Sequence, residues 1–165
     1  MPELTSPDNH HLNAATGWLE LGNHLEAKAE LGKISSANRR QPAVLEVDWR
    51  ILAAEKNWPG ALAVARELVQ ADPDNASGWI HQSYTLHEMK QTREAFDLLL
   101  TVFERFPGLS TIPYNLACYA CQLGDLDQAR GWLAKAMRIR GKEDIKKVAL
   151  SDPDLQPMWE AIRKL

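Results

Sequence analysis

The chain has 165 residues, of which 45% are hydrophobic and 25% are charged. This length and composition are typical of one folded globular domain that buries a core without disulfides or metals, and they exclude intrinsically disordered and collagen-like classes. The formal net charge of −3 comes from 19 basic and 22 acidic side chains. Because sequence-independent binding to a phosphate backbone requires a strongly basic surface, we expect no nucleic-acid partner.

The first residues contain no basic stretch followed by an apolar run, so we expect no secretory signal. The longest apolar stretch, residues 98–103, is far shorter than the roughly 18 residues that a membrane helix needs. The only two cysteines, Cys118 and Cys121, are too close in the sequence to staple distant segments together. These features predict a cytoplasmic protein with no membrane partner.

Alanine recurs at one constant interval, at Ala27, Ala61, Ala95 and Ala129. Three further columns with the same spacing hold small or apolar residues: Ile34, Leu68, Val102 and Ala136; Leu31, Ala65, Leu99 and Leu133; Trp18, Leu52, Leu86 and Ala120. The columns define four contiguous repeats without insertions, residues 8–41, 42–75, 76–109 and 110–143, and a tail over residues 144–165. A fixed period of this length indicates tandem copies of one structural unit.

Each repeat predicts two amphipathic helices joined by a short polar turn, because its apolar residues recur at offsets of three and four. Pro59 suits the first turn of a second helix, Gly124 suits a helix C-terminus, and Asp125 suits a helix N-cap. In the tail, residues 144–150 and 158–165 predict two short helices that cover the last repeat, separated by a turn at 151–157. We therefore expect an all-α protein without strands.

The third repeat has Trp79, Ser83, Ala95 and Pro107 at its positions 4, 8, 20 and 32, where tetratricopeptide repeats have these residue types. The chain therefore resembles the tetratricopeptide-repeat family over residues 8–143, and the length of its repeats agrees with the family's period. The resemblance implies a right-handed α–α superhelix, a solenoid of four tandem helix–turn–helix repeats plus C-terminal capping helices, in a single domain over residues 1–165.

Three residues depart from the family pattern. Arg39 stands in place of the terminal proline, Trp49 occupies a small-residue position, and Pro113 replaces the tryptophan. These departures leave the register unchanged. Most of the six tryptophans fall on apolar columns, so we interpret them as core residues rather than as a stacking platform for bases or sugars.

The sequence contains no phosphate loop, dinucleotide fingerprint, zinc-protease motif or hydrolase nucleophile elbow, so we expect no enzymatic activity. Cys118 and Cys121 form the sharpest local motif, but they lie in the middle of a helix, where no helix dipole lowers a thiol pKa. Only His87 could join them as a metal ligand, whereas a structural zinc site needs four ligands. We interpret the cysteines as small buried residues and expect no metal and no other cofactor.

The resemblance implies that the first helix of each repeat lines a concave groove. The residues expected to contact a partner there are Leu12, Thr16, Glu46, Arg50, Ile80, Tyr84, His87, Glu88, Tyr114, Cys118 and Gln122. This mixture of apolar, aromatic and charged side chains suits a helix or an extended peptide. Family members that clamp the terminal carboxylate of chaperones use Lys and Asn at two of these positions, and their absence here disfavours that function.

The leading hypothesis is a protein-binding adaptor or scaffold that presents this groove to a peptide or helix of one partner protein. The alternative is a cytoplasmic chaperone for secreted proteins, because small bacterial secretion chaperones resemble this chain in size and repeat type. A third hypothesis is a regulatory or catalytic domain that uses Cys118, Cys121 and His87. The basic run at 138–147 could receive an acidic partner, although cations at a helix end also complement the helix dipole. The sequence does not indicate an oligomeric state.

Overall fold

A computed structural model describes residue 4 and residues 6–165 of the chain. Within this range every regular element is a helix and no strand occurs, so the expected all-α class is confirmed. The expectation about an amino-terminal signal falls partly on residues 1–3 and 5, which lie outside the described residues. None of the described helices combines the length and the apolar character that crossing a bilayer requires.

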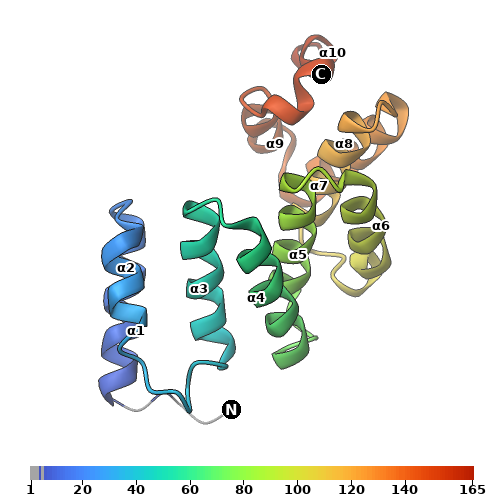
Figure 1. Ribbon diagram of the computed structural model, residues 1–165. Coiled ribbons are helices and arrows are strands. Elements are labelled where there is room, and N and C mark those ends of the chain that lie inside the picture. Colours follow the sequence, from blue (N-terminus) through green and yellow to red (C-terminus); the bar gives the residue numbers. More distant parts are fainter. Residues whose placement is uncertain (1–3, 5) are drawn as a thin grey trace. The chain divides into compact units, whose positions relative to one another are not determined.

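The chain divides into two compact units, residues 1–85 and 86–165, and the boundary falls within helix α5. The amino-terminal unit contains α1 (Ser6–Glu20), α2 (His24–Leu31), α3 (Pro42–Ala54), α4 (Trp58–Ala71) and most of α5 (Ala76–Glu88). The carboxy-terminal unit contains the end of α5, α6 (Thr92–Val102), the 3-10 helix η1 (Phe103–Arg105), α7 (Thr111–Gln122), α8 (Leu126–Arg140), α9 (Lys142–Ala149), the 3-10 helix η2 (Pro153–Met158) and α10 (Trp159–Arg163). Within the units, α1 packs against α2, α3 against α4, and α7 against α8 (Figure 1).

A residue with positive φ follows the first helix of every repeat. These residues are Gly22, Lys56, Lys90 and Gly124, with φ of 76°, 55°, 66° and 84°, and they recur at the same interval as the alanines. After each of them, the next amide donates a hydrogen bond to the carbonyl five residues earlier, from Asn23 to Trp18, Asn57 to Leu52, Gln91 to Leu86 and Asp125 to Ala120. The left-handed residue and this bond end the helix and reverse the chain. The repeat is therefore present in the backbone as well as in the sequence.

The second helix of a repeat begins directly after this turn. The side chains of Asn23, Asn57 and Asp125 each accept a hydrogen bond from the amide three residues later, at 3.2, 3.2 and 2.9 Å. Pro59 lies in the first turn of α4, where its missing N–H costs no helical hydrogen bond. The predicted roles of Pro59, Gly124 and Asp125 are confirmed.

The recurring alanines lie in the interior of the protein. Ala27, Ala61, Ala95 and Ala129 all have 0% of their surface exposed, as the register predicted. The column that begins at Trp18 is less uniform, because Trp18 is 37% exposed. Helix α1 packs against α2 and α3, which leaves its remaining face open, so the expectation that this tryptophan fills the core was wrong.

The first repeat differs from the others after its second helix. Helix α2 has 8 residues, whereas α4 has 14 and α8 has 15. The connection that follows is held by the buried Asp8 carboxylate, which accepts hydrogen bonds from the amide and hydroxyl of Ser35 and from Asn38 and therefore has a pKa below its usual value. Arg39 donates to the carbonyls of Gly32 and Ile34. Arg39, which replaces the family's proline, thus satisfies carbonyl groups at the end of this short helix.

The tail forms the two expected short helices, α9 and α10, joined through η2. Leu155, Met158 and Ile162 are buried, and the indole N–H of Trp159 donates to the carbonyl of Ala149 at 3.0 Å. Helix α9 packs on α8 and η2 packs on α7, so the tail covers the last helix pair. Burial of its apolar residues is what holds it there.

The turn geometry makes a first prediction. A lysine with positive φ is strained relative to glycine, so we expect Lys90→Gly to raise the free energy of unfolding by about 0.5–1 kcal/mol. The control Arg66→Gly removes the same charge from an exposed position inside α4, and it should lower the free energy of unfolding by about 0.5–1 kcal/mol. Urea unfolding of the two variants measures both values. A loss of stability in Lys90→Gly would contradict the left-handed conformation.

Two glycines within helices make a second prediction. A Cβ at Gly78 would lie 2.9 Å from the backbone nitrogen of Val69, whereas a Cβ at Gly131 would meet no atom within 4 Å. We expect Gly78→Ala to lower the free energy of unfolding by about 1–3 kcal/mol through overpacking of α5 against α4. Gly131→Ala should raise it by about 0.5–1 kcal/mol because alanine favours a helix more. Equal effects in urea unfolding would show that α4 and α5 are not this close.

Candidate functional site

The predicted groove residues of α1 have little surface to offer a partner. Leu12 is 8% exposed and belongs to the core of the amino-terminal unit together with Ala15 and Val47. The hydroxyl of Thr16 is hydrogen-bonded to the carbonyl of Leu12 at 2.9 Å. Leu12 lies in the core because it is on the face of α1 that meets the neighbouring helices, so its expected place in an open groove was wrong.

Helices α3, α4 and α5 bring together an aromatic cluster, which consists of Trp49, Trp58, His81 and Tyr84. The rings of Trp49 and His81 are stacked, with centroids 3.6 Å apart and planes 9° apart. Tyr84 makes edge contacts with Trp49 and Trp58, each with centroids 6.1 Å apart. The ring contacts hold Tyr84 in place, yet 38% of its surface is exposed.

Hydrogen bonds hold two rings of the aromatic cluster, Trp49 and His81, in place. The indole N–H of Trp49 donates to the hydroxyl of Thr85 at 3.0 Å, and Nε2 of His81 lies 2.6 Å from a carboxylate oxygen of Glu46. Burial alone would raise the pKa of Glu46. The hydrogen bond and charge of His81, a hydrogen bond from Ser77 and the charge of Arg50 together outweigh burial, and the pKa lies below its ordinary value. Glu46, one of the predicted site residues, therefore orients His81 beneath the ring of Trp49.

Arg50 and Ile80 are half-buried on the same two helices. Arg50 forms no ion pair within 4 Å among the described residues, although its charge acts on Glu46. Since Trp49 contacts His81, Tyr84 and Thr85, the register of α3 against α5 places Arg50 and Tyr84 at the same level of the two helices. We name the side of α3 and α5 that carries Glu46, Arg50, Ile80 and Tyr84 the α3–α5 face, and that these residues act as one binding surface stays a prediction.

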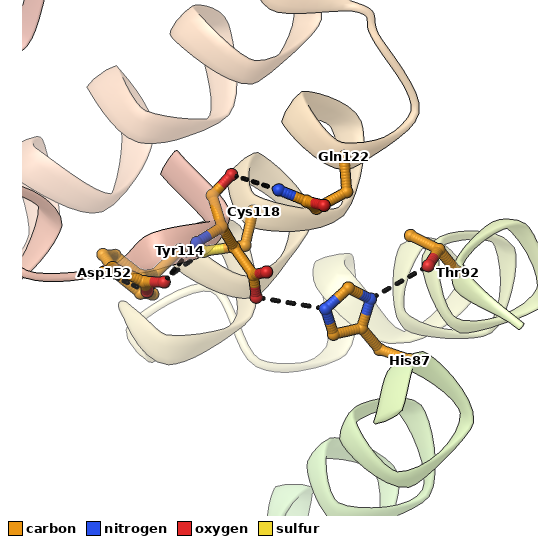
Figure 2. Close-up of polar contacts among 7 residues, drawn as sticks. His87, Thr92, Tyr114, Cys118, Gln122 and Asp152 are labelled. Atoms are coloured by element: carbon orange, nitrogen blue, oxygen red, sulfur yellow. Dashed lines mark hydrogen bonds and ion pairs between the residues drawn. The ribbon is translucent and has the colours of Figure 1, made fainter. Parts of the chain in front are cut away.

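In the carboxy-terminal unit, the predicted residues of α7 contact the tail of the same chain (Figure 2). The hydroxyl of Tyr114 donates to Asp152 at 2.7 Å, and the thiol of Cys118 lies 3.5 Å from the same carboxylate oxygen. The side-chain amide of Gln122 donates to the carbonyl of Asp154 at 2.8 Å. These contacts come from residues 150–154, which we name the strap.

His87, near the end of α5, contacts the second carboxylate of the strap. Its Nε2 lies 3.0 Å from Asp154, and its Nδ1 lies 3.0 Å from the hydroxyl of Thr92 (Figure 2). His87 is 8% exposed and Glu88 beside it is half-buried. The strap therefore covers expected groove residues of the last repeat, Tyr114, Cys118 and Gln122, and also contacts His87 of the third repeat.

The environment of the two cysteines opposes thiol chemistry. Burial, together with the nearby Asp152 and Asp154 carboxylates, raises the pKa of Cys118 and of Cys121 above the ordinary value. Burial and the hydrogen bond to Asp152 likewise raise the pKa of Tyr114. All three groups stay protonated at neutral pH, so the thiols are poor nucleophiles, and Tyr114 and Cys118 act as hydrogen-bond donors. Among the described residues, no three His, Cys, Asp or Glu side chains gather in a way that could hold a metal ion.

Sequence reasoning missed Asp152 and Asp154 as members of this site. It identified residues 151–157 only as a turn, and the contact of Tyr114 with Asp152 spans 38 residues without any periodic signal. It also assigned Trp49 only as a departure from the family pattern. The register of the repeats could have placed Trp49 next to the helix that carries His81 and Thr85.

Helix pairs with one turn geometry and one small-residue column, recurring at a constant interval along the chain, define a tetratricopeptide-repeat fold. The chain is similar to PilF of Pseudomonas aeruginosa, with a TM-score of 0.77 and 21% identity over 96% of this chain and 70% of that one. It is also similar to MamA (41–end) from Desulfovibrio magneticus RS-1, with a TM-score of 0.73 and 17% identity over 98% and 94% of the two chains.

A third similar structure is a thermophilic TPR protein of Thermus thermophilus, with a TM-score of 0.74 and 16% identity over 96% of this chain and 100% of that one. At these identities the similarity establishes the fold. No protein-family model matches the sequence, and no curated protein matches it either.

The pKa of Glu46 makes a third prediction. Because its folded-state pKa is lowered, the carboxylate stabilises the fold above its unfolded-state pKa, and this contribution disappears as the pH falls through the folded-state value. Glu46→Gln should therefore be less stable than the unchanged chain at pH 7, and the difference should shrink as the pH falls below the unfolded-state pKa and through the lower folded-state pKa of Glu46. Urea unfolding across this range measures it. The control is Glu104→Gln, an exposed carboxylate without an ion pair among the described residues, and an equal pH dependence in both variants would contradict the prediction.

Proposed function

We propose that this protein is a non-enzymatic adaptor that binds a peptide or helix of a partner protein on the α3–α5 face. The observation that carries the proposal is the aromatic cluster, in which Tyr84 remains 38% exposed between two tryptophan rings. Tyrosine, tryptophan and arginine dominate the energetics of protein interfaces, because they bring much contact area with few rotatable bonds. The tetratricopeptide-repeat fold supports a protein-interaction scaffold in general.

The charge pattern of this face supports binding of a protein segment. Glu46 is engaged by His81, whereas the guanidinium of Arg50 has no carboxylate within 4 Å among the described residues. Its planar set of N–H groups can therefore bind backbone carbonyls or a carboxylate of the partner. The rings of Trp58 and Tyr84 would contact apolar side chains of the same segment.

A cytoplasmic chaperone for secreted proteins would use the same face on a different class of partner. A photo-crosslinking amino acid at Ile80, introduced into the protein in its native host, would attach the partner covalently for mass spectrometry. A secreted client would identify a chaperone, and a resident protein would identify an adaptor. The cytoplasmic location stays a prediction.

The fourth prediction concerns affinity. Once the partner is known, Arg50→Ala and Tyr84→Ala should each weaken its binding at least tenfold, which corresponds to about 1.4 kcal/mol. The control is Leu100→Ala on α6, because Leu100 has a similar exposure of 42% and lies in the other unit. Isothermal titration calorimetry measures the dissociation constants, and circular dichroism verifies folding. Unchanged affinity in both folded variants would exclude the α3–α5 face.

A further inference from the structure

The strap lies on α7 in the way that a bound peptide lies on a receptor. Tyr114, Cys118 and Gln122 stand four residues apart, so they share one face of the helix over a length of about 12 Å. All three direct a hydrogen-bond donor at the strap, two of them at the Asp152 carboxylate and one at the carbonyl of Asp154 (Figure 2). A row of donors on one helix face thus meets a row of acceptors on one short segment.

The second carboxylate of the strap is bound from a different helix. Nε2 of His87 lies 3.0 Å from Asp154, and the contact of Nδ1 with Thr92 sets the orientation of the ring. Two carboxylates separated by one residue, Asp152 and Asp154, are therefore held by side chains of α5 and α7. This spacing gives the surface a defined chemical preference for a doubly acidic segment.

Buried apolar residues hold the strap at its two ends, and only polar contacts hold it along its length. Ala149 and Leu155 have 0% of their surface exposed, whereas residues 150–154 are all half-buried or exposed. Lifting the strap breaks polar contacts that water can replace, and it also releases the start of η2, where the Asp152 carboxylate accepts from the Asp154 amide at 3.0 Å. The side chains of Leu155, Met158 and Ile162 are buried beyond this point. Opening would therefore displace residues 150–154 and the first residues of η2, while the buried side chains of Leu155, Met158 and Ile162 would keep the rest of the tail on the core.

We propose that the strap is an internal ligand, and that the face of α7 beneath it binds an acidic segment of a partner protein when the strap lifts. The partner segment would carry two carboxylates separated by one residue, as the strap does. This surface belongs to the carboxy-terminal unit and is independent of the α3–α5 face. Its test therefore needs neither the adaptor function nor the partner of that face.

The thiol of Cys118 reports whether the strap is open. In a chain with Cys121→Ala, Cys118 is the only thiol, and the strap covers it. We expect maleimide labelling of the native protein to be at least tenfold faster in Asp152→Asn with Asp154→Asn than in the parent chain. Asp144→Asn, an exposed acidic residue of α9, is the matched control and should label at the parental rate.

Tyr114→Phe distinguishes faster labelling caused by opening of the strap from faster labelling caused by a lower pKa of the Cys118 thiol. This variant removes one donor but keeps both carboxylates, whose charge also affects the pKa of Cys118. It should label at least threefold faster than the parent at equal pH. Circular dichroism verifies folding, and Tyr114→Phe alone decides the outcome if the double variant is unfolded. Labelling at the parental rate in the folded variants would overturn the proposal, because the strap would then be held by other contacts.

A peptide supplied in trans tests recognition. A synthetic peptide with the sequence of residues 148–156, acetylated and amidated, is added at about 1 mM, a concentration chosen for weak peptide binding. It should slow maleimide labelling of Cys118 at least threefold in the chain that carries Cys121→Ala, Asp152→Asn and Asp154→Asn. The same peptide with Asn at both Asp positions should not slow it. Equal effects of the two peptides, or no effect of either, would show that the strap is a structural cap and not an internal ligand.

Discussion

The left-handed residue between the two helices of each repeat is the constraint on which the packing depends. Gly22, Lys56, Lys90 and Gly124 reverse the chain at the same point of each repeat. Residues at the same position of different repeats therefore lie at the same height along their helix pairs. A small side chain suits the interface between the two helices of a pair, and all four alanines of that column are fully buried. At two of the turns a lysine adopts this conformation, so the surrounding helix packing must compensate for its strain.

Much of the fold could be predicted because the same physical requirement recurs in every repeat. The alanine column, the turn at Gly124 and the cap at Asp125 each have a local signal in the side chains. A lysine in the sequence does not indicate positive φ. The turn conformation of Lys56 follows only from its position in the repeat, which is the position that Gly22 and Gly124 occupy in theirs. For Leu12 the prediction failed. The groove positions of the tetratricopeptide-repeat family predict that Leu12 lines a groove, whereas the packing of α1 places it in the core.

The strap could not be predicted, because its position depends on where the tail packs. Burial of Leu155 and Ile162 brings Asp152 and Asp154 next to a helix that is about one repeat earlier in the sequence. No pattern of spacing connects a carboxylate in an irregular turn with a tyrosine 38 residues away. Polar contacts of this kind follow from the path of the chain, whereas the apolar columns determine that path.

The two surfaces satisfy their polar groups in different ways, and this decides what each can gain from a partner. No buried side-chain nitrogen or oxygen in the described part of the chain lacks a hydrogen-bond partner. On the α3–α5 face, Trp49 and His81 are satisfied by Thr85 and Glu46, so a partner gains mainly by covering ring surface and by binding Arg50. On α7 the donors already have acceptors, so an incoming segment must exchange hydrogen bonds one for one. For the binding that we propose, affinity at α7 would therefore depend on matching the carboxylates of the strap, whereas affinity at the α3–α5 face would depend on the apolar area that is buried.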